Sequence, residues 1–179
     1  MEEVELNKIE PIHKGRIFEI VRETITLPNE ISVDLEIIRH PGAALMVPLV
    51  DSEEVILIKQ YRHAVKRFIW EFPAGTLAKG ESPLECAKRE LIEEIGYSAA
   101  QWDKLGEIIP VPGYSDEVIH VFLARNLTCC TQHLDPDEIL EVHKVKFEEA
   151  MQMIARGEIC DSKSISALFL TDLRLKGKK

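Results

Sequence analysis

The sequence predicts a mixed α and β protein, and three observations carry that prediction. Short apolar or alternating runs, typical of strands, occur in both halves of the chain. One segment in the middle has the start and stop signals of a helix, and two helical patterns follow near the end. A length of 179 residues with 45% hydrophobic and 30% charged residues suits one globular domain with a small addition.

The first part of the chain has the pattern of a β-hairpin. Residues 15–27 and 31–39 alternate apolar and polar side chains around a Pro-Asn turn signal. Two strands are only marginally stable alone, so the hairpin must dock on another surface. We expect residues 1–41 to form a small antiparallel β subdomain and residues 42–179 to form the main domain.

The main domain should be built around strands. Residues 43–50 and 54–61 are apolar and β-branched, which predicts central strands with a turn at Asp51-Ser52 between them. Helical spacing near the end predicts one helix that stops at Gly157 and another that begins at Asp161-Ser162. Three further strand-like runs lie near residues 106–111, 117–124 and 141–147.

The middle helix is predicted for residues 83–95. Ser82 can cap its N-terminus, Pro83 suits the first helical position, and Glu85 can bond back to the cap. Gly96 stands where a left-handed residue ends a helix. These signals fix which residues share one side of the helix.

Three glutamates crowd one side of this helix. Glu90 and Glu94 are four residues apart, with Glu93 beside them, and like charges at this spacing repel. A hard divalent cation makes the arrangement favourable, because Mg²⁺ takes carboxylate oxygens, several waters and substrate phosphates. The stripe therefore predicts a Mg²⁺ or Mn²⁺ site, with Arg89 bridging Glu85 and Glu93 to orient the glutamates. The alternative is a solvated acidic face, which the cap, glycines and arginine disfavour.

This segment, GTLAKGESPLECAKRELIEEIGY, resembles the Nudix box. From Gly75 onward it reads Gly, five residues, Glu, seven residues, Arg-Glu-Leu, one residue, Glu-Glu, one residue, Gly. Only the last place departs, where Tyr97 replaces the usual aliphatic residue. The resemblance implies an α/β/α sandwich with a mixed sheet, and hydrolysis of a nucleoside diphosphate derivative.

The resemblance also implies roles for individual residues of the box. Glu90 and Glu94 would bind the metal, with Glu93 adjacent to it. The backbone carbonyl of Ala74 would be a further ligand. Gly75 and Arg89 would support the site, since they match the first and the central positions of the box.

Segments outside the box resemble the ADP-ribose pyrophosphatase group. Pro112 matches a position typical of that group, and the likeness extends over nearly the whole chain. It implies cleavage of ADP-ribose to AMP and ribose 5-phosphate. Other similar stretches are residues 39–43, 59–62, 70–75 and 157–163.

Hydrolysis needs a base that accepts the proton of water while a bound cation neutralises the diphosphate. Glu117 matches the family position proposed for this task, and its neighbour Asp116 is the alternative. Arg62 matches a phosphate or ribose contact, since a guanidinium suits phosphate; the alternative is a surface pair with Glu71 or Glu54. Arg39 resembles another substrate contact, with a salt bridge as the alternative.

The formal net charge of −9 disfavours nucleic acid as a partner, because a basic footprint would be expected. No apolar run approaches membrane-spanning length, so we expect no membrane segment and a cytoplasmic protein. The four cysteines lack zinc-site spacing, and we expect Cys86 to be buried. The family resemblance implies a homodimer through the N-terminal subdomain, and a hairpin folded back on its own domain is the alternative.

Three other functions stay open at this point. The nearest is hydrolysis of GDP-mannose or another nucleotide sugar. A non-catalytic ligand sensor is the second, although a sensor needs none of the acidic residues. An enzyme that removes oxidised nucleoside triphosphates ranks third, because such proteins resemble shorter chains without the N-terminal hairpin.

Overall fold

The computed structural model describes residues 3–51, 53–136 and 138–177. Its chain divides into two compact units. The first contains the residues up to Gly42 together with Ile109–Val118. The second contains Ala43–Ile108 and the residues from Ile119 onward.

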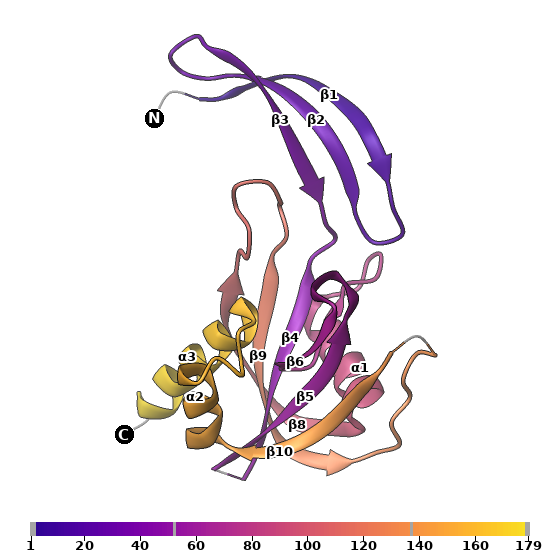
Figure 1. Cartoon of the computed structure of the whole chain (residues 1–179), viewed down its shortest axis with the longest axis vertical. Helices are drawn as coiled ribbons and strands as arrows, with labels where there is room; N and C mark the ends of the chain where they lie inside the picture. Colours follow the sequence, from indigo (N-terminus) through magenta and orange to yellow (C-terminus); the bar gives the residue numbers. More distant parts are fainter. Residues whose placement is uncertain (1–2, 52, 137, 178–179) are drawn as a thin grey trace. The chain divides into compact units, whose positions relative to one another are not determined.

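The first unit is an antiparallel sheet with the strand order β1-β2-β3 (Figure 1). The predicted hairpin corresponds to β2 and β3, whereas β1 was not predicted. Two register shifts interrupt β1, between Leu6 and Lys8 and between Pro11 and His13, so its apolar residues do not recur with period two. Proline is also tolerated mainly on edge strands, which is where β1 lies. The strands are β1 Glu5–Lys14, β2 Glu19–Thr26 and β3 Ser32–Arg39.

The loop Ile109–Val118 joins this unit through backbone hydrogen bonds to the end of β3. The N–H of Ile38 donates to the carbonyl of Tyr114 at 2.8 Å. The N–H of Asp116 donates to the carbonyl of Ile38 at 3.2 Å. These bonds hold Asp116 and its neighbour Glu117 beside the last residues of β3.

The second unit is built on a mixed sheet with the order β10-β5-β4-β9-β8. Strands β6 and β7 extend it by pairing with β5 and β4. The β4–β9 pair is parallel and the other pairs are antiparallel. The strands are β4 Ala43–Val50, β5 Glu54–Arg62, β6 Arg67–Glu71, β7 Ala74–Thr76, β8 Tyr97–Ile108, β9 Ile119–Cys129 and β10 Leu140–Lys146, with a 3-10 turn at His63–Val65.

The two central strands are confirmed, since β4 and β5 lie inside the sheet. Asp51 has a φ of 55°, in keeping with the expected turn, while Ser52 lies outside the described residues. Strand β8 is much longer than the run predicted near residues 106–111, because it begins at Tyr97. Its residues are mostly half-buried or exposed, so no apolar run marks it.

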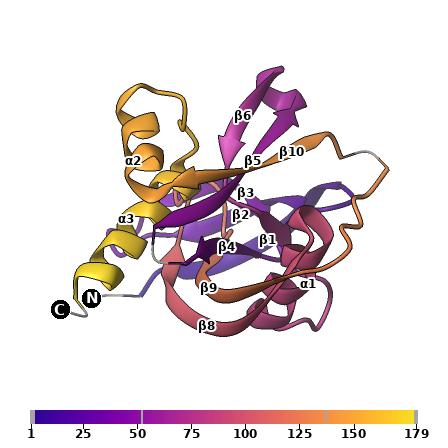
Figure 2. The same cartoon turned by 90° about the horizontal axis from the view of Figure 1, so that it is seen from below.

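Helices cover both faces of this sheet (Figure 2). Alternate residues of β4 supply the two cores, as the period of a strand requires. Ala44 and Met46 belong to the cluster that contains Leu91 of the first helix. Leu45 belongs to the cluster that contains Leu168 of the last helix. The α/β/α sandwich is therefore confirmed, with the helices α1 Pro83–Ile95, α2 Phe147–Ala155 and α3 Ser162–Lys176.

The C-terminal helices begin where the sequence signals place them. Asp161 caps α3, because its side chain accepts a hydrogen bond from the N–H of Ser164. Gly157 has a φ of 73° and follows α2. Within the described ranges, no helix is long and apolar enough to cross a membrane.

Candidate active site

Helix α1 has the two ends that its sequence predicts. Ser82 Oγ accepts the N–H of Glu85 at 3.3 Å, and Glu85 Oε2 accepts the N–H of Ser82 at 3.0 Å. Pro83 follows as the first helical residue. At the other end Gly96 has a φ of 69°, and its N–H donates to the carbonyl of Ile92 at 3.0 Å. The helical register of the glutamates is therefore fixed locally.

The segment after β9 closes the C-terminal turn of α1. The N–H of His133 donates to the carbonyl of Glu93 at 3.1 Å, and the N–H of Cys130 donates to the carbonyl of Gly96 at 2.7 Å. The amide of Gln132 donates to the carbonyl of Glu94. These bonds satisfy carbonyls that a helix end leaves without partners.

Arg89 binds carboxylates on both sides of its position. Its Nε donates to Glu81 at 2.8 Å, and its Nη1 donates to Glu90 at 2.6 Å and to Glu93 at 2.8 Å. The predicted bridge to Glu93 is confirmed. The predicted bridge to Glu85 is wrong, because the capping box already engages that carboxylate.

Gly75 allows the backbone of β7 to approach the Glu90 side chain. A Cβ atom at position 75 would lie 1.9 Å from Cδ and Oε1 of Glu90. Any other residue would therefore have to displace the carboxylate. This contact gives a physical reason for the first glycine of the box.

Glu94 is almost fully buried, with 3% of its surface exposed. Its Oε2 accepts the N–H of Ala74 at 2.9 Å. Burial, and then the charges of Glu90 and Glu138, raise the pKa of Glu94 well above its ordinary value. Burial also raises the pKa of Glu90, although Arg89 acts against that shift.

These two carboxylates fit a hard divalent cation. Both are oxygen donors in a poorly solvated place, where negative charge is unfavourable unless it is compensated. Arg89 is bonded to Glu93 as well as to Glu90. Across residues 3–51, 53–136 and 138–177 no three His, Cys, Asp or Glu side chains are grouped to hold a metal ion. Mg²⁺ commonly uses one or two carboxylates and completes its shell with waters and phosphates. The carbonyl of Ala74 as a ligand stays a prediction.

The sequence interpretation missed Glu138. This residue precedes β10, and the N–H of Tyr61 in β5 donates to the carbonyl of Ile139 at 3.0 Å. The charge of Glu138 contributes to the raised pKa values of Glu90 and Glu94. The signal that could have revealed it is the acidic run at residues 135–138, directly before a strand.

Arg62 ends β5 and is paired with Glu71. Its Nε donates to Glu71 Oε2 at 2.7 Å, which is the salt bridge that the sequence left open as an alternative. Burial acts to lower the pKa of Arg62, but Glu71 and then the charge of Glu94 raise it overall. Arg62 therefore lies within electrostatic reach of the buried glutamate.

The remaining predicted residues lie in the first unit. Arg39 donates to Asp116 at 2.9 Å and is also paired with Glu23, so the salt-bridge alternative is what the structure shows for it. Burial acts to raise the pKa of Asp116, but the N–H of His40 and the Arg39 guanidinium lower it overall. A lowered pKa makes Asp116 the weaker candidate base.

Glu117 and Pro112 belong to the loop of the first unit. Glu117 Oε1 lies 3.7 Å from Nδ1 of His40, too far for a hydrogen bond. That Nδ1 accepts the N–H of Gly42 at 3.0 Å instead. Pro112 lies in a turn that the N–H of Ser115 closes on the carbonyl of residue 111 at 3.1 Å. The catalytic role of Glu117 stays a prediction.

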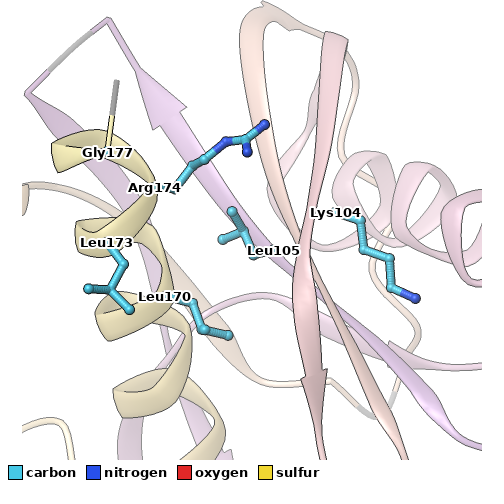
Figure 3. A pocket seen from close by; sticks show the side chains of 6 residues that line it. All are labelled: Lys104, Leu105, Leu170, Leu173, Arg174 and Gly177. Carbon is cyan, nitrogen blue, oxygen red and sulfur yellow. The ribbon is translucent and has the colours of Figure 1, made fainter. Parts of the chain in front are cut away.

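A pocket of about 360 Å³ lies elsewhere in the second unit, between α3 and β8 (Figure 3). Its two cations are already paired, Arg174 with Asp103 and Lys104 with Glu107. In Figure 3 Lys104 extends away from the leucines that line the pocket. The pocket contains none of the predicted site residues. Its lining comprises Lys104, Leu105, Leu170, Leu173, Arg174 and Gly177.

Comparisons with known proteins show what this chain is similar to. The NUDIX domain model matches residues 39–168. The chain is 38% identical over 167 residues to the ADP-ribose pyrophosphatase of Bacillus subtilis (strain 168), covering 92% of this chain and 90% of that protein. It is 36% identical over 163 residues to the methanol dehydrogenase activator of Bacillus methanolicus, covering 90% and 88%. A crystal structure of an ADP compounds hydrolase matches with a TM-score of 0.88 and 25% identity, covering 99% and 97%.

Proposed function

The chain belongs to the Nudix hydrolase family, and from that premise we propose that it hydrolyses the pyrophosphate bond of ADP-ribose, giving AMP and ribose 5-phosphate. A similar nucleoside diphosphate sugar is the other substrate of this class. The observation that carries the proposal is the pair of poorly solvated carboxylates, the buried Glu94 and the partly buried Glu90, with Arg62 in electrostatic reach of Glu94. The activity named for the Bacillus subtilis relative supports ADP-ribose as the first substrate to test.

The proposed cofactor is Mg²⁺, with Mn²⁺ as a substitute. Glu90, Glu94 and the carbonyl of Ala74 would hold it, because hard oxygen donors suit these ions. When bound, the ion would offset the charge of the diphosphate and polarise the bond that breaks. Arg89 keeps Glu90 and Glu93 in place through its hydrogen bonds.

The proton of the attacking water needs an acceptor, and two carboxylates compete for that role. Glu117 matches the family position, and its neighbour Asp116 has a lowered pKa. Glu138 is the second candidate, because the bond between Tyr61 and Ile139 holds the neighbouring residue beside the end of β5, within electrostatic reach of Glu90 and Glu94. We propose Glu93 as an adjacent catalytic residue and Arg62 as the contact to phosphate, with Arg39 as a further substrate contact.

We also propose a homodimer formed through the N-terminal sheet. Cross-strand partners share a face of a sheet, so the register divides this one into a polar and an apolar face. The polar face carries paired side chains such as Thr24 with Asp34 and Arg22 with Glu36. An apolar face this large on a small sheet needs a covering surface. Its apolar residues are Leu6, Ile9, Pro11, Val21, Ile25, Val33, Leu35 and Ile37, and Glu23, which is paired with Arg39, lies among them.

The activity is tested directly with a substrate panel. Protein, Mg²⁺ and ADP-ribose should yield AMP and ribose 5-phosphate, separated by anion-exchange chromatography. GDP-mannose and other nucleotide sugars, assayed in parallel, rank the preference by kcat/KM. No product from any member of the panel, with either Mg²⁺ or Mn²⁺, would reject the hydrolase and favour a ligand sensor.

A further inference from the structure

Glu71 is a buried carboxylate shared by two cations from different elements. Its side chain is 3% exposed at the end of β6. Oε2 accepts the Nε of Arg62 at 2.7 Å, and Oε1 accepts the Nζ of Lys163 in the first turn of α3. Lys163 also donates to Asp161 at 2.8 Å. Four charged side chains thus form one continuous network of ion pairs.

Among these four ion-paired side chains, only one is exposed to solvent to a large extent. The side chains of Lys163 and Asp161 are 14% and 15% exposed, whereas that of Arg62 is 41% exposed. Replacing a buried ion pair with apolar residues is often neutral or stabilising, so stability alone is a weak explanation for this arrangement. The buried groups instead present Arg62 at the surface of the unit.

The geometry leaves Arg62 free to bind an anion. A guanidinium has five N–H donors, and Glu71 engages Nε at 2.7 Å and Nη2 at 3.4 Å. Three donors therefore remain for a ligand. Because the bond at Nε restricts rotation of the guanidinium plane, less side-chain entropy is lost when a phosphate binds.

Lys163 changes how Glu71 acts on Arg62. A lone carboxylate would largely neutralise the guanidinium charge. Here Oε1 of Glu71 is bonded to an ammonium group, so the charge of Glu71 is divided between two cations. Asp161 fixes Lys163 while it caps α3, accepting the N–H of Ser164 at 3.0 Å.

We propose that Glu71 is a positioning residue that holds Arg62 ready for the diphosphate of the substrate, and that Lys163 preserves the positive charge of Arg62 by sharing the Glu71 carboxylate. This inference rests on the proposed function in one respect, that the ligand carries a diphosphate. Glu71 acts through Arg62 and has no contact with the substrate itself.

The test compares Glu71→Gln with the wild type. The amide keeps the shape of the side chain and one acceptor oxygen but loses the charge, so Arg62 is held less firmly. We expect the KM for ADP-ribose to rise about tenfold, the effect of one charge-assisted hydrogen bond, while kcat stays within about twofold. An unchanged KM would overturn the inference. Glu71→Asp, which retains the charge, should recover part of the loss and also serves if the amide variant does not fold.

A double mutant shows whether Glu71 acts through Arg62. Arg62→Met alone should raise KM, and adding Glu71→Gln should raise it no further, because the residue being positioned is gone. Additive effects of the two substitutions on KM would overturn the inference. Lys163→Met should raise KM by a smaller factor than Glu71→Gln, since Glu71 then neutralises Arg62 more fully; an unchanged KM would remove Lys163 from the mechanism.

Asp103→Asn is the matched control. Asp103 also joins two cations from different elements, accepting Arg174 at 3.0 Å and pairing with Arg125. We expect this variant to lower the melting temperature about as much as Glu71→Gln does, with KM unchanged. A KM shift in the control equal to that of Glu71→Gln would show a general loosening of the fold and overturn the inference.

Calorimetric titration with inorganic pyrophosphate and Mg²⁺ separates this inference from the proposed activity. If the wild type binds pyrophosphate and Glu71→Gln weakens binding about tenfold, the inference holds even where no nucleotide sugar is hydrolysed. If the wild type hydrolyses ADP-ribose but Glu71→Gln changes neither pyrophosphate binding nor KM, the inference fails and the activity stands.

Discussion

The Glu90 carboxylate occupies the space that a side chain at position 75 would need, so its position depends on glycine there. Gly75→Ala should push the Glu90 carboxylate away, because the new Cβ would lie 1.9 Å from it. We expect kcat/KM to fall by about a hundredfold, the scale of a 1 Å misplacement at a reacting centre. Circular dichroism should show that the fold survives.

Gly106→Ala is the control for that substitution. Its Cβ would meet only Leu170 Cδ1 at 3.6 Å, an ordinary contact. Its activity should match the wild type. Full activity in Gly75→Ala would show that the Glu90 carboxylate need not occupy its observed place.

Replacing each candidate base, Glu117 or Glu138, with glutamine shows which of the two accepts the proton of water. Whichever of Glu117 and Glu138 accepts the proton should lose about a hundredfold in kcat on conversion to Gln, with KM little changed, as expected for general-base catalysis. Turnover of both variants at the wild-type rate would reject both residues as the base.

Single residues were predictable here wherever their neighbours are local in sequence. Ser82, Glu85 and Gly96 were identified because a helix end involves residues three or four apart. Glu138 was missed because its effect on Glu90 requires the pairing of β10 with β5, which no local pattern reveals.

At the scale of elements, Arg89 ties the loop before α1 to the helix through Glu81. The Arg89 hydrogen bond is the main reason that the pKa of Glu81 is lowered from 4.5 to about 2. A group with a lower pKa in the folded state binds protons preferentially in the unfolded chain. Its contribution to stability is therefore complete above pH 4.5 and is lost as the pH falls toward 2.

The hydrogen bonds between Arg89 and Glu81 predict how the stability of the protein changes in acid. In urea unfolding measured at successively lower pH, Glu81→Gln should lose less free energy of unfolding across the window between pH 4.5 and 2 than the wild type does. The variant should also be less stable than the wild type at neutral pH. If the free energy of unfolding fell equally with pH in the two proteins, the pairing of Glu81 with Arg89 would be contradicted.

Elements were predictable where burial and period agree. Strand β4 was identified with its bounds because nearly every residue is buried, whereas the twelve residues of β8 are half-buried or exposed and show no period. Strands β6 and β7 have five and three residues, too few for a period to be recognised. Strand β1 is long enough, but two register shifts interrupt the alternation of its apolar residues.

At the scale of the whole molecule, the apolar face of the N-terminal sheet predicts assembly. Leu35→Glu places a charge on that face, and we expect the variant to sediment as a monomer where the wild type sediments as a dimer. Ser32→Glu, which places the same charge on the polar face beside Thr26, should remain a dimer. A monomeric wild type would contradict the proposed assembly.

The sandwich itself was expected from the resemblance of the central segment to the Nudix box, and it agrees with the burial of nearly every β4 residue, since a strand buried on both faces needs a layer on each side of the sheet. The grouping of Ile109–Val118 with the N-terminal strands was not. It depends on backbone bonds between Ile38 and Tyr114, far apart in sequence and without any side-chain signal.

Calorimetric titration with Mg²⁺ and Mn²⁺ shows whether Glu90 and Glu94 bind a divalent cation. We expect saturable binding by the wild type and at least tenfold weaker binding by Glu94→Gln. The variant should keep roughly the same fold stability, because its amide oxygen can still accept the N–H of Ala74. No binding by the wild type, even with AMP present, or equal affinity in the two proteins, would contradict this role of Glu90 and Glu94.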